Sequence, residues 1–171
     1  MKIGLLGGSF NPPHAGHLHI SDLAIGHLNL DKIWWIPTAH NPLKDLKIYE
    51  NYENRVEKCQ ILTKNHQKID VHPFDEIYTI KLVTKLKGDF RDIDFTWVMG
   101  ADNFERLHEW DNLIDLIKII PFAVFSRENY LEKIAESEAF KMIKNAHLEN
   151  NLQIFATKNL DISSTQIRNN V

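Results

Sequence analysis

The sequence contains very little cysteine and no long apolar run, and both absences restrict the classes of protein it can belong to. Cys59 is the only cysteine in 171 residues, so an intramolecular disulfide is impossible and a reducing compartment is expected. The longest apolar region, residues 113–125, contains Asp115, Lys118 and Pro121, which argues against a helix through a membrane. The N-terminus has no signal-peptide pattern, because two glycines interrupt its apolar run. A cytoplasmic protein is therefore expected.

A large excess of charge and a flexible linker are missing as well. The formal net charge of −3 at pH 7 gives no overall attraction to nucleic acid or to an acidic membrane, so neither is an expected partner. Any anionic ligand has to be held by a local cluster of residues. No internal repeat, low-complexity segment or linker rich in proline, glycine and serine divides the chain, so one domain over residues 1–171 is expected.

Short apolar segments alternate with amphipathic segments along the chain. The first kind predicts strands, and the second kind, with apolar residues at helical spacing, predicts helices. The strands are expected at residues 2–7, 32–37, 68–74, 95–100, 121–126 and 152–157, and the helices at 17–28, 52–65, 78–87, 110–119 and 129–146. This order predicts an α/β fold with a Rossmann-like open, mainly parallel sheet and helices on both of its faces.

Four segments with unusual residues follow predicted strands. Ligands of such sheets bind beyond the carboxyl ends of the strands, where these segments would meet. They are GGSFNPPHAGH (7–17), TAHNPLK (38–44), GADNF (100–104) and SR (126–127). Their convergence predicts a ligand site at this edge of the sheet.

The first of these segments has the residues that a phosphate site needs. Gly7 and Gly8 end a strand without side chains, which lets backbone N–H groups approach a ligand. Gly16 opens a helix whose unpaired N–H groups favour an anion, and His14 and His17 lie three residues apart at that helix start. Histidines that only cap the turn are the alternative. A zinc site is disfavoured, because no suitable third ligand lies nearby.

The segment GGSFNPPHAGH resembles the HxGH signature of the nucleotidyltransferase superfamily, and its form is most similar to the bacterial nicotinate mononucleotide adenylyltransferase family. Later segments agree with that family in order: WWIPTAHNPLK (34–44), YT (78–79), WVMGADNFERLHEW (97–110) and ISSTQIR (162–168). The resemblance implies transfer of the adenylyl group of ATP to nicotinate mononucleotide, giving deamido-NAD and pyrophosphate in NAD biosynthesis. It implies ATP and nicotinate mononucleotide as partners and Mg²⁺ that arrives with ATP, and it leaves a homo-oligomer open.

The same resemblance implies roles for individual residues. The catalytic residues would be His14, His17, Lys44 and Arg168, with the histidines donating to the ATP phosphates and the two cations neutralising phosphate and pyrophosphate. The implied ATP site also contains Gly7, Gly8, Ser9, Phe10, Gly100, Asp102, Ser164 and Thr165, and the implied pyridine nucleotide site contains Lys44, Tyr78, Thr79 and Trp110. A helix cap is the alternative role for Asp102, and a core residue is the alternative for Trp110.

Two other functions remain open at this point. The first is another HxGH nucleotidyltransferase, above all a phosphopantetheine adenylyltransferase, whose first motif usually has threonine where His14 stands and which lacks the closing ISSTxIR motif. A non-catalytic nucleotide-binding module would be expected to have lost a phosphate contact, yet His14, His17 and Arg168 are all present. The chain stops at Val171, whereas members of the family continue with a further helix, which leaves a truncated C-terminus open.

Overall fold

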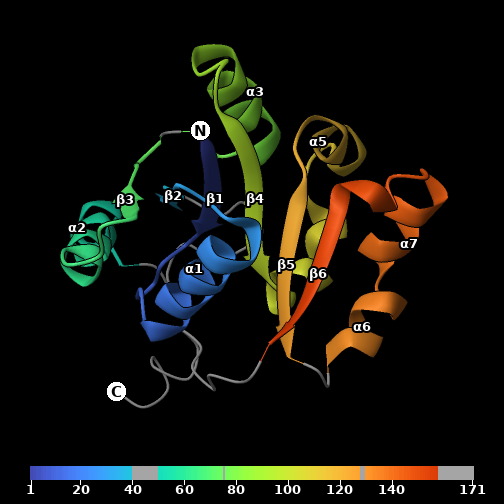
Figure 1. The fold of residues 1–171 in the computed structure, drawn as a ribbon, viewed down its shortest axis with the longest axis horizontal. Helices are drawn as coiled ribbons and strands as arrows, with labels where there is room; N and C mark the ends of the chain where they lie inside the picture. The colour runs from blue at the N-terminus through green and yellow to red at the C-terminus, as the bar shows by residue number, and fades with distance from the viewer. Residues whose placement is uncertain (40–49, 75, 128–129, 158–171) are drawn as a thin grey trace.

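A six-stranded parallel sheet forms the centre of the structure, a computed structural model that describes residues 1–39, 50–74, 76–127 and 130–157. The strands lie in the order β3-β2-β1-β4-β5-β6, and all neighbours are parallel (Figure 1). They are β1 (Lys2–Gly8), β2 (Lys32–Pro37), β3 (Ile69–Val71), β4 (Asp94–Gly100), β5 (Phe122–Arg127) and β6 (Leu152–Thr157). The predicted Rossmann-like α/β class is confirmed.

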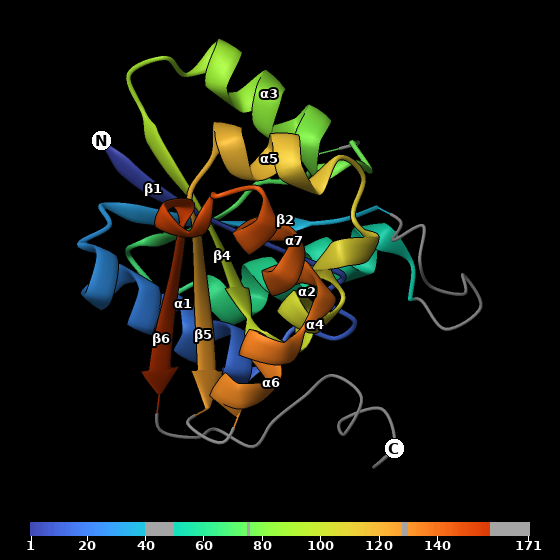
Figure 2. The same ribbon diagram turned by 90° about the vertical axis from the view of Figure 1, so that its right-hand side faces the viewer.

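Helices connect the strands and cover both faces of the sheet. Figure 2 shows α1 on one side of β5 and β6, with α6 and α7 on the other side. Within the described ranges, no helix is long and apolar enough to cross a membrane. The helices are α1 (Ala15–Leu28), α2 (Tyr52–Thr63), α3 (Thr79–Asp89), α4 (Ala101–Glu105), η2 (Leu107–Glu109), α5 (Leu113–Ile119), α6 (Leu131–Glu136), α7 (Glu138–Asn145) and η4 (Glu149–Asn151).

Three predicted elements differ from those in the structure. The strand expected at 68–74 is only three residues long, and Pro73 just beyond it has no N–H for a sheet ladder. The helix expected at 129–146 is divided at Ser137, whose hydroxyl caps α7 by accepting from the Phe140 N–H at 3.2 Å. No helix was expected within the segment GADNF, since five residues are too few to show helical periodicity, but α4 starts there.

The core consists of two layers, one on each face of the sheet. Trp34 and Trp35 are neighbours on β2 and therefore point to opposite faces, and each is buried in a different layer. Cys59 on α2 is also buried, and this burial raises the pKa of its thiol to about 12. The thiol therefore has no reactive thiolate at neutral pH, and Cys59 acts as a small apolar residue of the core.

The strand order determines where a ligand can bind. β1 connects to β2 on one side of it, whereas β4 is its neighbour on the other side and continues to β5. In doubly wound sheets the crevice beyond two such strands, where the direction of winding reverses, is the usual ligand site. The loop after β1 and the short helix α4 after β4 both start at this point.

Candidate active site

The glycine pair at the end of β1 serves two different purposes. A Cβ on Gly7 would stand 2.5 Å from the Trp97 ring, so the indole fills the space that a side chain would need. At Gly8 the nearest atom is 3.4 Å away, on the Phe10 ring, which is ordinary contact. The structure therefore gives Gly7 a packing reason for lacking a side chain, and ligand approach explains only Gly8.

The loop after β1 is held by the aromatic ring of Phe10. This ring is 1% exposed, and its centroid lies 4.9 Å from that of Trp35 and 4.6 Å from that of His17. The backbone of Phe10 has a φ of 45°, a left-handed conformation that side chains other than those of Asn and Asp rarely adopt. Because the ring is enclosed by protein, Phe10 can contact a ligand only through its backbone.

His14 and His17 form a reciprocal cap at the start of α1. The His14 ring accepts from the Gly16 N–H at Nδ1 (3.1 Å), and the His17 ring accepts from the His14 N–H at Nδ1 (3.2 Å). A neutral imidazole that accepts at Nδ1 carries its proton at Nε2. The two histidines thus cap the helix, and the cap leaves both Nε2–H groups directed away from the helix backbone. The ring centroids are only 4.0 Å apart, so both donors can reach one anion.

Both histidines are neutral at physiological pH. Burial and, to a smaller extent, the neighbouring His14 ring lower the pKa of His17 to about 3. Burial also lowers the pKa of His14, and the negative charge of Asp102 partly opposes this decrease. Neutral rings keep the Nδ1 acceptors that the cap requires, so the electrostatics and the hydrogen bonds agree.

We expect these lowered pKa values to make the protein less stable in acid. An unfolded histidine titrates near 6.5, so below that pH the unfolded chain binds a proton that folded His17 does not bind until about pH 3. Stability is therefore lost as the pH falls from 6.5 towards 3. Between pH 7 and 5, His17 should contribute about 2 kcal/mol of this loss. Urea unfolding of wild type and His17→Ala at both values checks this, and an equal loss in the two proteins would contradict it.

A hydrogen-bonded chain fixes α1 to the sheet below the histidine pair. The Trp35 indole N–H donates to the Ser21 hydroxyl at 2.8 Å, and this hydroxyl donates to the His17 carbonyl at 2.8 Å. Sequence reasoning missed Ser21. The sequence could have indicated this residue, because a small polar side chain four positions after His17 lies on the same face of the helix.

Asp102 lies beside the pair of His14 and His17, on the first turn of α4. A Cβ on Gly100 would stand 2.8 Å from the Asp102 Oδ1, so the carboxylate folds back over that glycine. Any side chain at position 100 would displace the carboxylate. Gly100 and Asp102 therefore act together at the end of β4, close enough to the loop after β1 for Asp102 to affect the pKa of His14.

Comparison with known proteins agrees with this geometry. The model of the cytidylyltransferase-like family matches residues 5–170. A probable nicotinate-nucleotide adenylyltransferase of Agrobacterium fabrum is 37% identical over 131 residues, which cover 74% of this chain and 70% of that protein. A second, of Methylorubrum extorquens, is 35% identical over 153 residues, which cover 87% and 82%. The chain belongs to the nicotinate-nucleotide adenylyltransferase family. The predictions of this family and of a nucleotidyltransferase enzyme are confirmed.

Solved structures show the same fold. The nicotinic acid mononucleotide adenylyltransferase of Plasmodium falciparum, complexed with NaAD, superposes with a TM-score of 0.78. The match covers 98% of this chain and 82% of that chain at 19% identity. The same enzyme complexed with APC gives a TM-score of 0.75. At this identity the likeness concerns the fold, and it includes the sheet edge where the histidine pair lies.

The predicted pyridine site includes the N-terminus of α3. Tyr78 is the cap residue and Thr79 the first helical residue. The Glu76 Oε1 accepts from the N–H groups of Ile77 and Tyr78, both at 3.0 Å. Within the described residues, the N–H of Thr79 has no hydrogen-bond acceptor. The carboxylate of Glu76 thus binds the two N–H groups that precede α3 and leaves the first helical N–H open.

Trp110 lies outside the helix that was predicted to start with it. It was expected to open a helix, but it follows the 3-10 helix η2, and α5 starts only at Leu113. The residues between include Asn112 with a φ of 50°, which interrupts the helical pattern that the sequence suggested. The ring is partly buried and meets Trp97 edge-on at a centroid distance of 5.8 Å. Trp110 therefore packs against the ring that lies over Gly7.

The remaining predicted residues cannot be placed. Lys44, Ser164, Thr165 and Arg168 lie outside the described residues, so their roles stay predictions. Of the other predicted residues, the structure brings His14, His17 and Asp102 together at the sheet edge beyond β1 and β4.

Proposed function

We propose that this chain transfers the adenylyl group of ATP to nicotinate mononucleotide, with deamido-NAD and pyrophosphate as products. The observation that carries the proposal is the pair of neutral histidines, each with its Nε2–H directed away from the start of α1, at the edge where Rossmann-like sheets bind nucleotides. The names of the relatives support this choice of acceptor over phosphopantetheine.

The proposed reaction is a displacement at phosphorus. A phosphate oxygen of the mononucleotide attacks the α-phosphorus of ATP, the bond from that phosphorus to the bridging oxygen breaks, and pyrophosphate leaves with the electron pair. The attacking phosphate is already ionised at neutral pH, so no residue has to remove a proton. The protein has to bring two polyanions together and to stabilise the charge that moves to the leaving group.

The histidine pair suits this task. Two Nε2–H donors can bind phosphate oxygens, and the hydrogen bonds strengthen as negative charge develops on those oxygens. Because the Nδ1 atoms are held by the Gly16 and His14 N–H groups, the rings are oriented before substrate binds. The positive end of the α1 dipole adds to the same field. Lys44 and Arg168 would supply the full positive charges.

Magnesium would enter with ATP as part of the substrate. No group of three or more metal-binding side chains occurs in the part of the chain that the structure describes. Phosphate oxygens and water are the ligands that Mg²⁺ prefers, so the ATP complex itself supplies most of its coordination. The histidine donors would then bind the phosphate oxygens that the metal leaves exposed.

A single assay tests the proposal. Purified protein is incubated with Mg²⁺-ATP and one of three acceptors: nicotinate mononucleotide, nicotinamide mononucleotide or phosphopantetheine. Pyrophosphate release and the nucleotide product are then measured. Release with either mononucleotide supports an adenylyltransferase of pyridine nucleotides. Release only with phosphopantetheine, or ATP binding without turnover, would contradict it. Light scattering in the same buffer tests the homo-oligomer, and the single buried cysteine supports the proposed cytoplasmic location.

Trp110→Ala is expected to affect the mononucleotide more than ATP. If the indole stacks on the pyridine ring, its loss should raise the KM for nicotinate mononucleotide about tenfold, because ring stacking is worth roughly 1–3 kcal/mol. Its contact with Trp97 means that the melting temperature should also fall. Steady-state kinetics well below that temperature separate the two effects. Equal increases in KM for both substrates would leave only the core role.

A further inference from the structure

Arg55 is a buried cation whose guanidinium group donates to four backbone carbonyls. It lies on the first turn of α2, and the whole residue is 1% exposed. Nε donates to the Glu50 carbonyl at 3.0 Å, one terminal nitrogen donates to the carbonyls of Ser9 and Thr38, and the other donates to the Ala39 carbonyl at 2.9 Å. Removing a guanidinium group from water costs free energy, so the contacts that it makes in the protein have to offset that cost.

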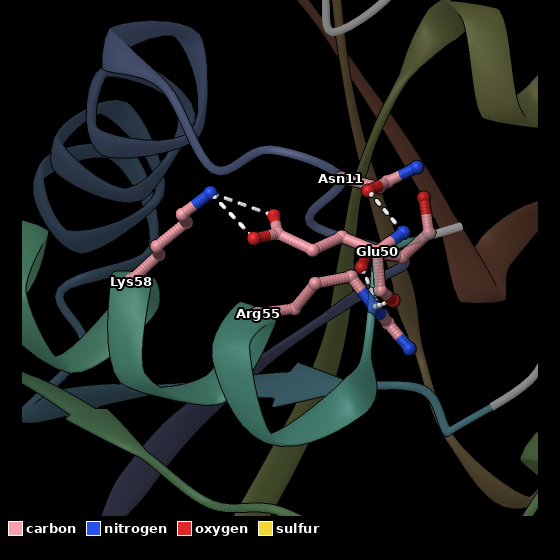
Figure 3. Close-up of polar contacts among 5 residues, drawn as sticks. Asn11, Glu50, Arg55 and Lys58 are labelled. Carbon is pink, nitrogen blue, oxygen red and sulfur yellow. Dashed lines mark hydrogen bonds and ion pairs between the residues drawn. The ribbon is translucent and has the colours of Figure 1, made fainter. Parts of the chain in front are cut away.

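The four carbonyls come from two different connections. Ser9 belongs to the loop after β1, residues 9–14, which is the proposed phosphate loop. Thr38 and Ala39 follow β2, and Glu50 precedes α2, so the last three flank the two ends of the connection between β2 and α2. Figure 3 shows Arg55 reaching back to Glu50, whose N–H donates at 3.1 Å to the Asn11 side chain of the phosphate loop. Arg55 thus links both ends of the connection between β2 and α2 to the loop after β1.

The contact with Ser9 also determines the direction of a donor. The Ser9–Phe10 peptide is trans, so its C=O and its N–H point in opposite directions. Holding the carbonyl against Arg55 turns the Phe10 N–H away from the guanidinium. In the described part of the chain this N–H has no acceptor, and the Phe10 ring is fixed beneath His17. The structure therefore leaves one oriented amide donor beside the histidine pair.

We infer that Arg55 is a positioning residue that aims the Phe10 N–H at the phosphates of ATP and fixes the spacing between the two connections. The inference rests on the proposed adenylyl transfer. Arg55 touches no substrate and acts through the backbone that it holds. A lysine in its place would keep the charge but could not reach four carbonyls from one planar group.

The test compares Arg55→Lys with Lys58→Met. Lys58 lies on the same helix and forms an exposed ion pair with the Glu50 carboxylate at 2.7 Å, and within the described ranges it makes no hydrogen bond to the phosphate loop. We expect kcat to fall about tenfold in Arg55→Lys, measured at a temperature where the variant is fully folded, because a small misplacement of binding groups slows the chemical step. Lys58→Met should stay within twofold of wild type. A folded Arg55→Lys enzyme with wild-type kcat would overturn the inference.

A measurement on the wild type covers the case in which Arg55→Lys does not fold. The ¹⁵N–¹H signal of the Phe10 amide should shift when inorganic pyrophosphate or α,β-methylene-ATP is added, and it should not shift with nicotinate mononucleotide alone. An amide signal that ignores both phosphate ligands overturns the inference. This readout does not depend on the acceptor, so a wild type that binds pyrophosphate at Phe10 but fails to use nicotinate mononucleotide would refute the proposed function alone.

Discussion

His17→Ala is expected to lower kcat by at least about two orders of magnitude. The substitution removes an oriented, neutral Nε2–H donor from the place where charge develops on the ATP phosphates, and loss of one such donor typically costs that much. The KM for ATP should change less, because the donor binds more strongly in the transition state than in the ground state. Steady-state kinetics with saturating nicotinate mononucleotide measure the effect.

The same substitution should cost little stability. The His17 ring caps the His14 N–H and contacts Phe10 and Trp35, so about 1–2 kcal/mol is at stake. His27 provides a matched control, since it lies in the last turn of the same helix and the centroid of its ring is 5.0 Å from that of Phe155. His27→Ala should keep kcat within twofold. A His17→Ala enzyme with nearly normal turnover would remove the catalytic role of this residue.

The second large effect that we expect is a preference for the acid over the amide. Nicotinate mononucleotide should be used with a kcat/KM ten- to a hundredfold higher than nicotinamide mononucleotide. The N-terminus of α3 offers backbone donors, among them the Thr79 N–H, and a carboxylate can accept several of them. An amide would have to turn its NH₂ group towards other donors, and leaving a buried donor unpaired costs about 1–3 kcal/mol.

Glu76 is the residue that could reverse this preference. Its Oε1 already accepts from the N–H groups of Ile77 and Tyr78, but its other oxygen could accept from the NH₂ group of an amide substrate. Competition between the two mononucleotides in one reaction decides the preference, and equal rates would contradict it. Glu76→Gln separates the causes: if the carboxylate accepts from the amide, this variant should lose amide turnover selectively.

Much of the fold follows from local patterns in the sequence. The strands around Trp34 and Phe122, the helix after His14 and the burial of Cys59 are all visible as short apolar runs or helical spacing. Errors occurred where the local signal was short or broken. The helix α4 has too few residues to show a period, and Asn112 and Ser137 interrupt helices that periodicity alone would have continued.

The site was only partly predictable for the same reason. The sequence itself indicated that GGSFNPPHAGH ends a strand, opens a helix and brings two histidines to one face, because these properties depend on neighbouring residues. Tertiary contacts decided the rest. The adjacency of β1 and β4, the Trp97 ring over Gly7, the tautomers of His14 and His17 and the four carbonyls around Arg55 each depend on groups far apart in the chain or on the geometry of a single turn. Residue periodicity carries no record of such pairings, since it reports which face is buried but not what is buried against it.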